Sequence, residues 1–308
     1  MTTLSAADAS TRRDAIDAFA TIVMLGLTLT WGVNQVAIKL ANIGFNPMLS
    51  MFLRSAVATL LVFLWCRYRG IRLFERDGTL WPGILAGLLF GLEFILVFFG
   101  LDYTSAARGA LMLNTMPFWV LVGGHFFLGE KMSALRFGGL LLAFAGVVLV
   151  FSDNLSLPGP DALFGDVLCL VAGIAWAATI VVIKQSSLSN AGAEKTLLYQ
   201  LSVSALLAIP FIPFGGPLLR EVSTLATGAL VFQAVFVVSF TYLVWFWLMR
   251  RYPASGLSSF TFLTPVFGVL SGGLLLGEPL TLKILLALCL IVLGLTVVNR
   301  PRRRVIPG

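Results

Sequence analysis

Apolar stretches of about twenty residues recur along almost the whole chain, separated by short breaks that contain polar residues, glycine or proline. A helix of about 20 apolar residues crosses a hydrocarbon layer about 30 Å thick. Continuous runs such as Ile84 to Leu101 favour helices, because the strands of a membrane barrel show alternating segments of about ten residues. The pattern predicts an all-α polytopic membrane protein with ten transmembrane helices. The expected spans are Phe19 to Leu40, Met48 to Cys66, Leu80 to Leu101, Ala106 to Leu128, Leu135 to Phe151, Leu163 to Lys184, Thr196 to Phe214, Leu225 to Met249, Ala254 to Leu276 and Leu282 to Val298.

Composition and charge agree with this prediction. The 308 residues are 58% hydrophobic and 11% charged, which is too apolar for a single soluble core. The net charge of +7 comes from basic residues in the connections and tails, so membrane topology explains it better than a nucleic-acid partner. With both termini on one side, that side holds 16 of the 21 basic residues, the other side holds four, and Arg54 lies inside a span. The positive-inside rule therefore predicts a cytoplasmic (inner) membrane protein with both termini in the cytoplasm.

Two parts of the chain repeat in the same order at nearly the same separation. Trp31 recurs as Trp176, 145 residues later, and Pro117 recurs as Pro265, 148 residues later. The other matching positions are Lys39 and Lys184, Leu128-Gly129-Glu130 and Leu276-Gly277-Glu278, and Gly146 and Gly294. Each copy holds five expected spans, an odd number, so the second copy enters the membrane from the opposite face. The prediction is two inverted five-helix repeats.

The domain division follows from this duplication. We expect a cytoplasmic tail at 1–16, a first repeat at 17–151, an extracytoplasmic linker at 152–161, a second repeat at 162–299 and a basic cytoplasmic tail at 300–308. Inverted repeats are typical of secondary transporters, which hold their substrate near the midplane where the halves meet and alternate between outward and inward shapes.

A set of short motifs, spread over nearly the whole chain, carries a family resemblance. They are Trp31-Gly32 with Asn34 and Lys39, Pro47 with Phe52-Leu53-Arg54, Tyr103-Thr104-Ser105-Ala106, Pro117, Leu128-Gly129-Glu130-Lys131, Gly146-Val147-Val148, Gly165-Asp166, Trp176-Ala177, Lys184, Tyr252-Pro253-Ala254-Ser255, Thr264-Pro265 and Leu276-Gly277-Glu278-Pro279. The chain resembles the EamA-type ten-helix branch of the drug/metabolite transporter superfamily, and within it the YddG-type aromatic amino acid exporters. The resemblance implies export of small metabolites, chiefly aromatic and other neutral amino acids, by a monomer or homodimer.

Polar and aromatic residues near the middle of the spans are the candidates for substrate binding. An intramembrane polar side chain faces the bundle interior, where it binds substrate or joins neighbouring helices, and the sequence leaves both roles open. The candidates are Trp31, Asn34, Phe90, Phe94, Asn114, Trp176, Ser239, Tyr242 and Thr264. For Phe90 and Phe94, plain packing or lipid contact is the alternative.

Two prolines and two charges have special positions. Pro117 and Pro265 are repeat-related and central, so they are expected to kink or open their helices and to serve as hinges, with packing as the alternative. Arg54 and Glu93 lie at similar depth in the outer half of the membrane and are expected to form a buried ion pair, with substrate recognition or proton coupling as alternatives.

Several other classes of protein lack their signatures in this sequence. The run from Gly124 to Lys131 reads GHFFLGEK, which is not a phosphate-binding loop, and His125 is the one histidine. The three cysteines lack metal-ligand or redox-pair spacing, so we expect no catalytic residues, no metal and no cofactor. The rivals to a secondary transporter of amino acids are a facilitative channel, an exporter of another metabolite or drug on the same fold, and a membrane sensor or assembly subunit.

Overall fold

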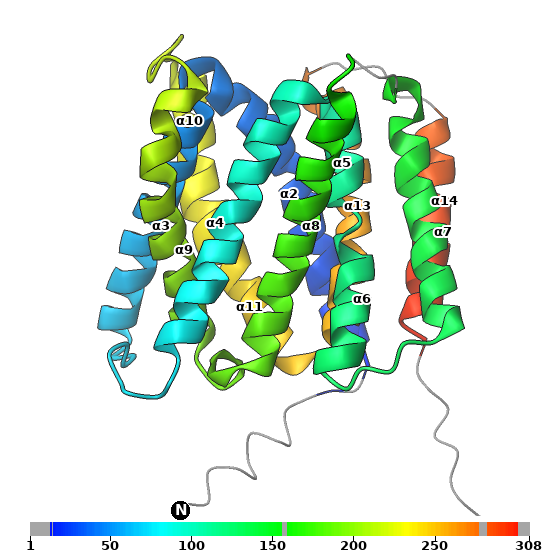
Figure 1. Ribbon diagram of the computed structural model, residues 1–308, viewed down its shortest axis with the longest axis horizontal. Helices are drawn as coiled ribbons and strands as arrows, with labels where there is room; N and C mark the ends of the chain where they lie inside the picture. Colours follow the sequence, from blue (N-terminus) through cyan, green and yellow to red (C-terminus); the bar gives the residue numbers. More distant parts are fainter. Residues whose placement is uncertain (1–12, 14, 156–158, 277–281, 301–308) are drawn as a thin grey trace, which may run out of the picture.

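The computed structural model describes residues 13, 15–155, 159–276 and 282–300. Apolar helices make up the first half of the described chain (Figure 1). They are α2 (Ala18–Gly44), α3 (Pro47–Tyr68), α4 (Leu80–Tyr103), α5 (Ala106–Leu113), α6 (Met116–Phe127) and α7 (Ala134–Phe151), followed by the short 3-10 helix η1 (Ser152–Asn154).

The helices of the second half are more irregular. Its elements are α8 (Ala162–Gln185), η2 (Ser187–Ser189), α9 (Ala193–Ala208), η3 (Ile209–Gly215), α10 (Thr224–Phe232), the π-helix η4 (Gln233–Thr241), α11 (Tyr242–Arg251), α12 (Ala254–Ser259), η5 (Phe260–Phe262), α13 (Leu263–Leu276) and α14 (Lys283–Val298). Among the described residues, nine helical segments are long and apolar enough to cross a membrane, and α14 is a shorter apolar helix. The prediction of an all-α polytopic membrane protein is confirmed.

The helices stand side by side, and their contacts keep the same pattern when the two halves are exchanged (Figure 1). The third span, α4, packs on α8, the sixth, while α10 in the eighth packs on α2, the first. Likewise α13 in the ninth span packs on α2, and α5 and α6 in the fourth pack on α8. The fifth and tenth spans, α7 and α14, pack on each other at one edge of the bundle.

Repeat-related helices also run in opposite directions. Ile16, just before α2, and Lys184, at the end of α8, line one cavity at the same end of the bundle. We call this end, which carries Arg13, Arg251 and Arg300, the basic end, and the other the opposite end. The antiparallel course of α2 and α8 is the geometry that an inverted duplication predicts.

Glycines allow several of the helices to approach closely. A Cβ on Gly294 of α14 would lie 2.5 Å from the carbonyl oxygen of Gly139 in α7, and a Cβ on Gly87 of α4 would lie 2.6 Å from Cβ of Val203 in α9. Such distances are below van der Waals contact, so these glycines fix how near the backbones come. Gly268 is different, because its nearest neighbour would be the Gln35 side chain at 3.6 Å, an ordinary contact.

Candidate functional site

Five aromatic side chains from α2, α4 and α11 form a continuous row across the middle of the bundle. Trp31 of α2 meets Trp245 and Tyr242 of α11 edge-on, with ring centroids 5.6 and 6.2 Å apart. Tyr242 in turn meets Phe90 of α4 at 6.2 Å, and Phe90 meets Phe94 at 5.2 Å. We call Trp31, Tyr242, Trp245, Phe90 and Phe94 the aromatic ladder.

The ladder is held in place by one hydrogen bond between helices. The indole Nε1 of Trp31 donates to Thr241 Oγ1 at 3.0 Å, and Thr241 Oγ1 donates to the carbonyl of Val237 at 2.5 Å. Trp31 is half-buried, so part of its ring surface remains available to another molecule. Edge-to-face pairs of this kind add to the energy gained by burying the rings.

The ladder ends on a buried arginine. The guanidinium carbon of Arg54, on α3, lies 4.3 Å from the centre of the Phe94 ring, a cation–π contact. Arg54 and Glu93 are each 6% exposed, and Arg54 Nε and Glu93 Oε2 have no hydrogen-bond partner within the described part of the chain. No ion pair within 4.0 Å joins these two residues there, and the guanidinium contacts the Phe94 ring instead. The pairing of Arg54 with Glu93 stays a prediction.

The remaining candidates are distributed around the same level. Ser239 Oγ donates to Ala234 O at 2.7 Å and Asn114 Nδ2 donates to Ala110 O at 2.8 Å, so both satisfy the backbone of their own helices. The Oδ1 of buried Asn34 and the Oγ1 of Thr264 have no partner among the described residues. Trp176 is half-buried against the main hydrophobic core.

Both predicted prolines lie directly after a break in their span. The fourth span is interrupted at Asn114 and Thr115, and Pro117 is in the first turn of α6. The ninth span is interrupted by the 3-10 turn η5, and Pro265 is in the first turn of α13. A proline supplies no amide donor and cannot extend the preceding helix, which accounts for the breaks at equivalent depth. Their role as hinges stays a prediction.

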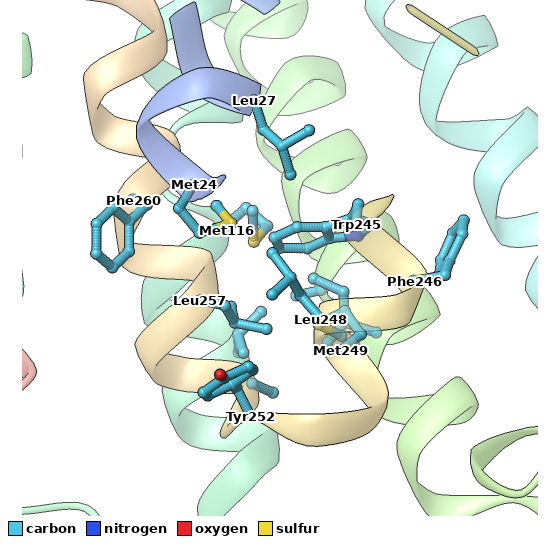
Figure 2. Close-up of a cluster of buried hydrophobic side chains, with 14 of the residues drawn as sticks. Met24, Leu27, Met116, Trp245, Phe246, Leu248, Met249, Tyr252, Leu257 and Phe260 are labelled. Carbon is cyan, nitrogen blue, oxygen red and sulfur yellow. The ribbon is translucent and has the colours of Figure 1, made fainter. Parts of the chain in front are cut away.

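Between the ladder and the basic end, apolar side chains fill the bundle (Figure 2). Met24 of α2, Met116 of α6 and Leu248 of α11 are each fully buried, and Figure 2 shows them gathered beside Trp245. Below this cluster a cavity of about 660 Å³ opens at the basic end. Its lining includes Arg13, Lys131, Arg136, Lys184, Arg250, Arg251 and Arg300.

At the opposite end, a buried ion pair joins α5 to α8. Arg108 pairs with Asp166, whose Oδ1 also accepts from Thr104 Oγ1 at 2.7 Å. Arg108 Nη1 further donates to Leu155 O at 2.9 Å. At the start of their helices, these residues therefore lock the fourth span to the sixth.

At the basic end, the corresponding junction uses weaker and more exposed contacts. Tyr252 Oη donates to both carboxylate oxygens of Asp17 at 3.1 Å, and Lys184 Nζ donates to Tyr252 O. Glu130 accepts from the amide of Ala254 at 2.7 Å, from the amide of Ser255 at 3.2 Å and from the Ser255 hydroxyl. The carboxylate of Glu130 thus caps α12, the first helix of the ninth span.

Some of the residues in this site were not selected from the sequence. Gln200 on α9 is 0% exposed, and Gln233 on η4 donates to Ala37 O at 3.3 Å. Both are amides within apolar spans, so the rule that selected Asn34 would have found them. Thr241 gave no signal, because a lone threonine in a helix is ordinarily satisfied by its own backbone. Within the described residues there is no group of three or more His, Cys, Asp or Glu side chains that could hold a metal ion.

The fold defines a polytopic helical membrane protein with a central aromatic and polar cluster. Residues 18–152 and 163–300 match the model of the EamA-like transporter family, and the chain belongs to that family.

Similar proteins cover almost the whole chain. An uncharacterized transporter of Archaeoglobus fulgidus is 30% identical over 91% of this chain and 99% of its own length. The uncharacterized transporter YoaV of Bacillus subtilis is 28% identical over 89% of this chain and 95% of its own length. A probable amino-acid metabolite efflux pump of Escherichia coli is 26% identical over 89% of this chain and 92% of its own length. A crystal structure with 19% identity matches 92% of this chain and 97% of its own with a TM-score of 0.79, which shows the fold.

Proposed function

We propose that this protein exports aromatic and other neutral amino acids by alternating access, as the resemblance to YddG-type exporters implies. The observation that carries the proposal is the aromatic ladder, which offers half-buried ring surface at mid-depth from both halves of the chain. The Escherichia coli relative named a probable amino-acid metabolite efflux pump supports this substrate class.

The proposed location is the cytoplasmic membrane, with the basic end and both termini in the cytoplasm. The support is the asymmetry of basic residues, which clusters Arg250, Arg251 and Arg300 at one end. A periplasmic reporter fused after residue 308 is expected to be inactive and a cytoplasmic reporter active. The reverse pattern would overturn this orientation.

The broken spans supply candidate hinges for the exchange of conformations. Pro117→Ala and Pro265→Ala should restore helix continuity and lower flux at least several-fold while changing the melting temperature little, because both residues follow an existing break. Flux in liposomes, compared with thermal unfolding of the purified variants, is the measurement. A loss of folding with unchanged specific flux would contradict the hinge role.

A facilitative channel is the main rival. An open pore would have to pass the packed side chains of Met24, Met116 and Leu248, which are fully buried in this conformation. This packing favours a carrier that must rearrange before substrate crosses.

The experiment that tests the proposal is flux of labelled phenylalanine, tryptophan, threonine and methionine into liposomes that contain the purified protein. Saturable flux that is accelerated by unlabelled substrate on the other side is expected for a carrier. Rapid flux without such acceleration would indicate a channel. No flux above empty liposomes would overturn the assignment of amino acids and favour another metabolite or drug. Repeating the assay with a proton gradient shows whether amino acid flux is coupled to proton movement.

A further inference from the structure

The strongest unexplained feature of the molecule is a group of buried polar side chains at one end of the aromatic ladder. Arg54, Glu93 and Gln200 come from α3, α4 and α9 and are 6%, 6% and 0% exposed. Within the described residues, Arg54 Nε, Glu93 Oε2 and both polar atoms of the Gln200 side chain have no hydrogen-bond partner. Buried polar groups are nearly always satisfied in native proteins, so each of these atoms needs an explanation.

The three helices that carry these residues meet at one place. Ser204 Oγ donates to Ser55 Oγ at 3.4 Å, which brings α9 against the neighbour of Arg54 in α3. A Cβ on Gly91 of α4 would lie 3.3 Å from Cα of the same Ser204, so α4 approaches there too. Gln200 is one helical turn from Ser204.

The two side chains lie near each other without a direct ion pair. Arg54 lies on the Phe94 ring, next in sequence to Glu93, and no N–O contact within 4.0 Å joins Arg54 to Glu93 in the described part of the chain. An isolated charge in a membrane interior is costly and ordinarily finds an opposite charge. A ligand that carries a positive and a negative group on one carbon atom could satisfy both Arg54 and Glu93 at once.

Resting on the proposed function, we infer that Arg54 binds the carboxylate and Glu93 the ammonium group of a zwitterionic amino acid whose apolar side chain lies along the aromatic ladder. A guanidinium presents paired N–H donors that match a carboxylate, and a carboxylate accepts the N–H bonds of an ammonium group. The Gln200 side chain has an amide NH₂ group with two donors and a carbonyl acceptor, so it can serve either end of the ligand.

The test uses three ligands that share a phenyl ring and differ in charge. Phenylalanine has both groups, 2-phenylethylamine lacks the carboxylate, and 3-phenylpropionate lacks the ammonium group. Each analogue should compete with labelled phenylalanine in liposomes about tenfold or more weakly than unlabelled phenylalanine, the effect of losing one charge-assisted contact.

Each single variant should remove one of the two preferences for phenylalanine over its analogues. Arg54→Gln should remove the preference for phenylalanine over phenylethylamine, and Glu93→Gln should remove the preference over phenylpropionate. The matched control is Thr30→Ala, because Thr30 is next to Trp31 yet its hydroxyl donates to Gly26 O in its own helix. The control should keep the wild-type ranking. A purely structural role would weaken all three ligands by the same factor, and that result would overturn the inference.

The double variant covers the case in which a single variant does not fold. Arg54→Gln with Glu93→Gln removes both charges, so no unpaired charge stays buried, and it should fold and lose both preferences. If the double variant retains the wild-type order of competition, Arg54 and Glu93 do not bind the charged groups of the ligand. If the wild-type protein carries phenylalanine and the variants show no charge-specific change, this inference fails while the proposed function stands. If the wild type carries no amino acid, both fail.

Discussion

The two ends of the bundle contain related junctions that are built from different chemistry. Asp17, the N-cap of α2, and Asp166, the fifth residue of α8, are 149 residues apart, close to the spacing of the repeat. Each binds the segment that precedes the fourth span of the other half: Asp166 binds Thr104, and Asp17 binds Tyr252. Two such junctions are what the predicted inverted duplication implies.

The difference between them is burial. The side chains of the Arg108–Asp166 pair are 16% and 8% exposed. At the basic end, Asp17 forms an ion pair with Arg13, and the side chains of Arg13 and Asp17 are 58% and 31% exposed. A buried pair is costly to break on one side, and an exposed pair contributes little. The junction at the opposite end therefore depends on one buried ion pair, while the junction at the basic end distributes its stability over several contacts of more exposed carboxylates.

The largest expected effect is at the buried pair. Asp166→Asn leaves Arg108 buried without its counter-ion and should cost about 3 kcal/mol of stability. The measurement is thermal unfolding of the purified protein in detergent. Adding Arg108→Gln to this variant should restore most of the loss, since no charge is then left unpaired. A single variant that melts like the wild type would remove the distinction between the two ends.

A smaller effect is expected at the cap of α12. Glu130→Gln keeps one acceptor oxygen but loses the charge and one of the two amide bonds, which should cost about 1 kcal/mol. Ser255→Ala is the control, because it removes the hydroxyl contact and leaves both amide bonds in place. The same unfolding assay applies, and a loss as large as that of Asp166→Asn would show that the basic end is also fixed by one contact.

Asp17→Asn should have a smaller effect still. An asparagine retains the oxygen that accepts from the Ala20 amide at 2.8 Å, and only the exposed charge is lost. The expected cost is below about 1 kcal/mol. Asp17→Ala also removes this cap and should cost more, so the order of the two variants checks the interpretation.

The last prediction concerns the pH dependence of stability at Asp77, in the loop between α3 and α4. Near neutral pH, a change of pH should have almost no effect there. Hydrogen bonds from Lys195 and then Thr79 lower the pKa of Asp77 to about 2. The pKa of an aspartate in the unfolded chain is about 3.9. The Asp77 carboxylate therefore stabilises the fold above that pH, and this contribution is lost as the pH falls toward 2. The stability difference between the wild type and Asp77→Asn should be constant from pH 7 to 5 and shrink below about pH 4. A difference that instead declines between pH 7 and 5 would contradict the assignment.

The spans were predictable because membrane crossing leaves a strong signal in the sequence. The apolar length of segments such as α4 is sufficient to place them, and Pro117 identified the break in the fourth span. The π-helix η4 was not predicted, since it changes the backbone hydrogen bonds without changing hydropathy. The 3-10 end of the seventh span, η3, was signalled only by its Pro210 and Pro213.

The site was predicted in part. The rule that polar and aromatic residues at mid-span face the interior selected Trp31 and Tyr242, which the structure brings together. It could not supply the contact of Arg54 with Phe94, because that depends on the rotation of α3 against α4. Arg108 was not selected from the sequence, since no local pattern signals a partner 58 residues away.

The π-helix η4 in the eighth span has no counterpart in the third span, where α4 is an α-helix. Backbone bonds from residue i to i+5 accommodate one more residue than an α-helical turn, as the bond from the Tyr242 amide to the Val237 carbonyl illustrates. Because each α-helical residue turns the chain by about 100°, that extra residue sets which side chains of α11 face the centre. The two halves thus present different residues at the centre, Phe90 from α4 and Tyr242 from α11. A local change in backbone hydrogen bonding therefore lets the second half offer a ring with a hydroxyl group where the first half offers a plain phenyl ring.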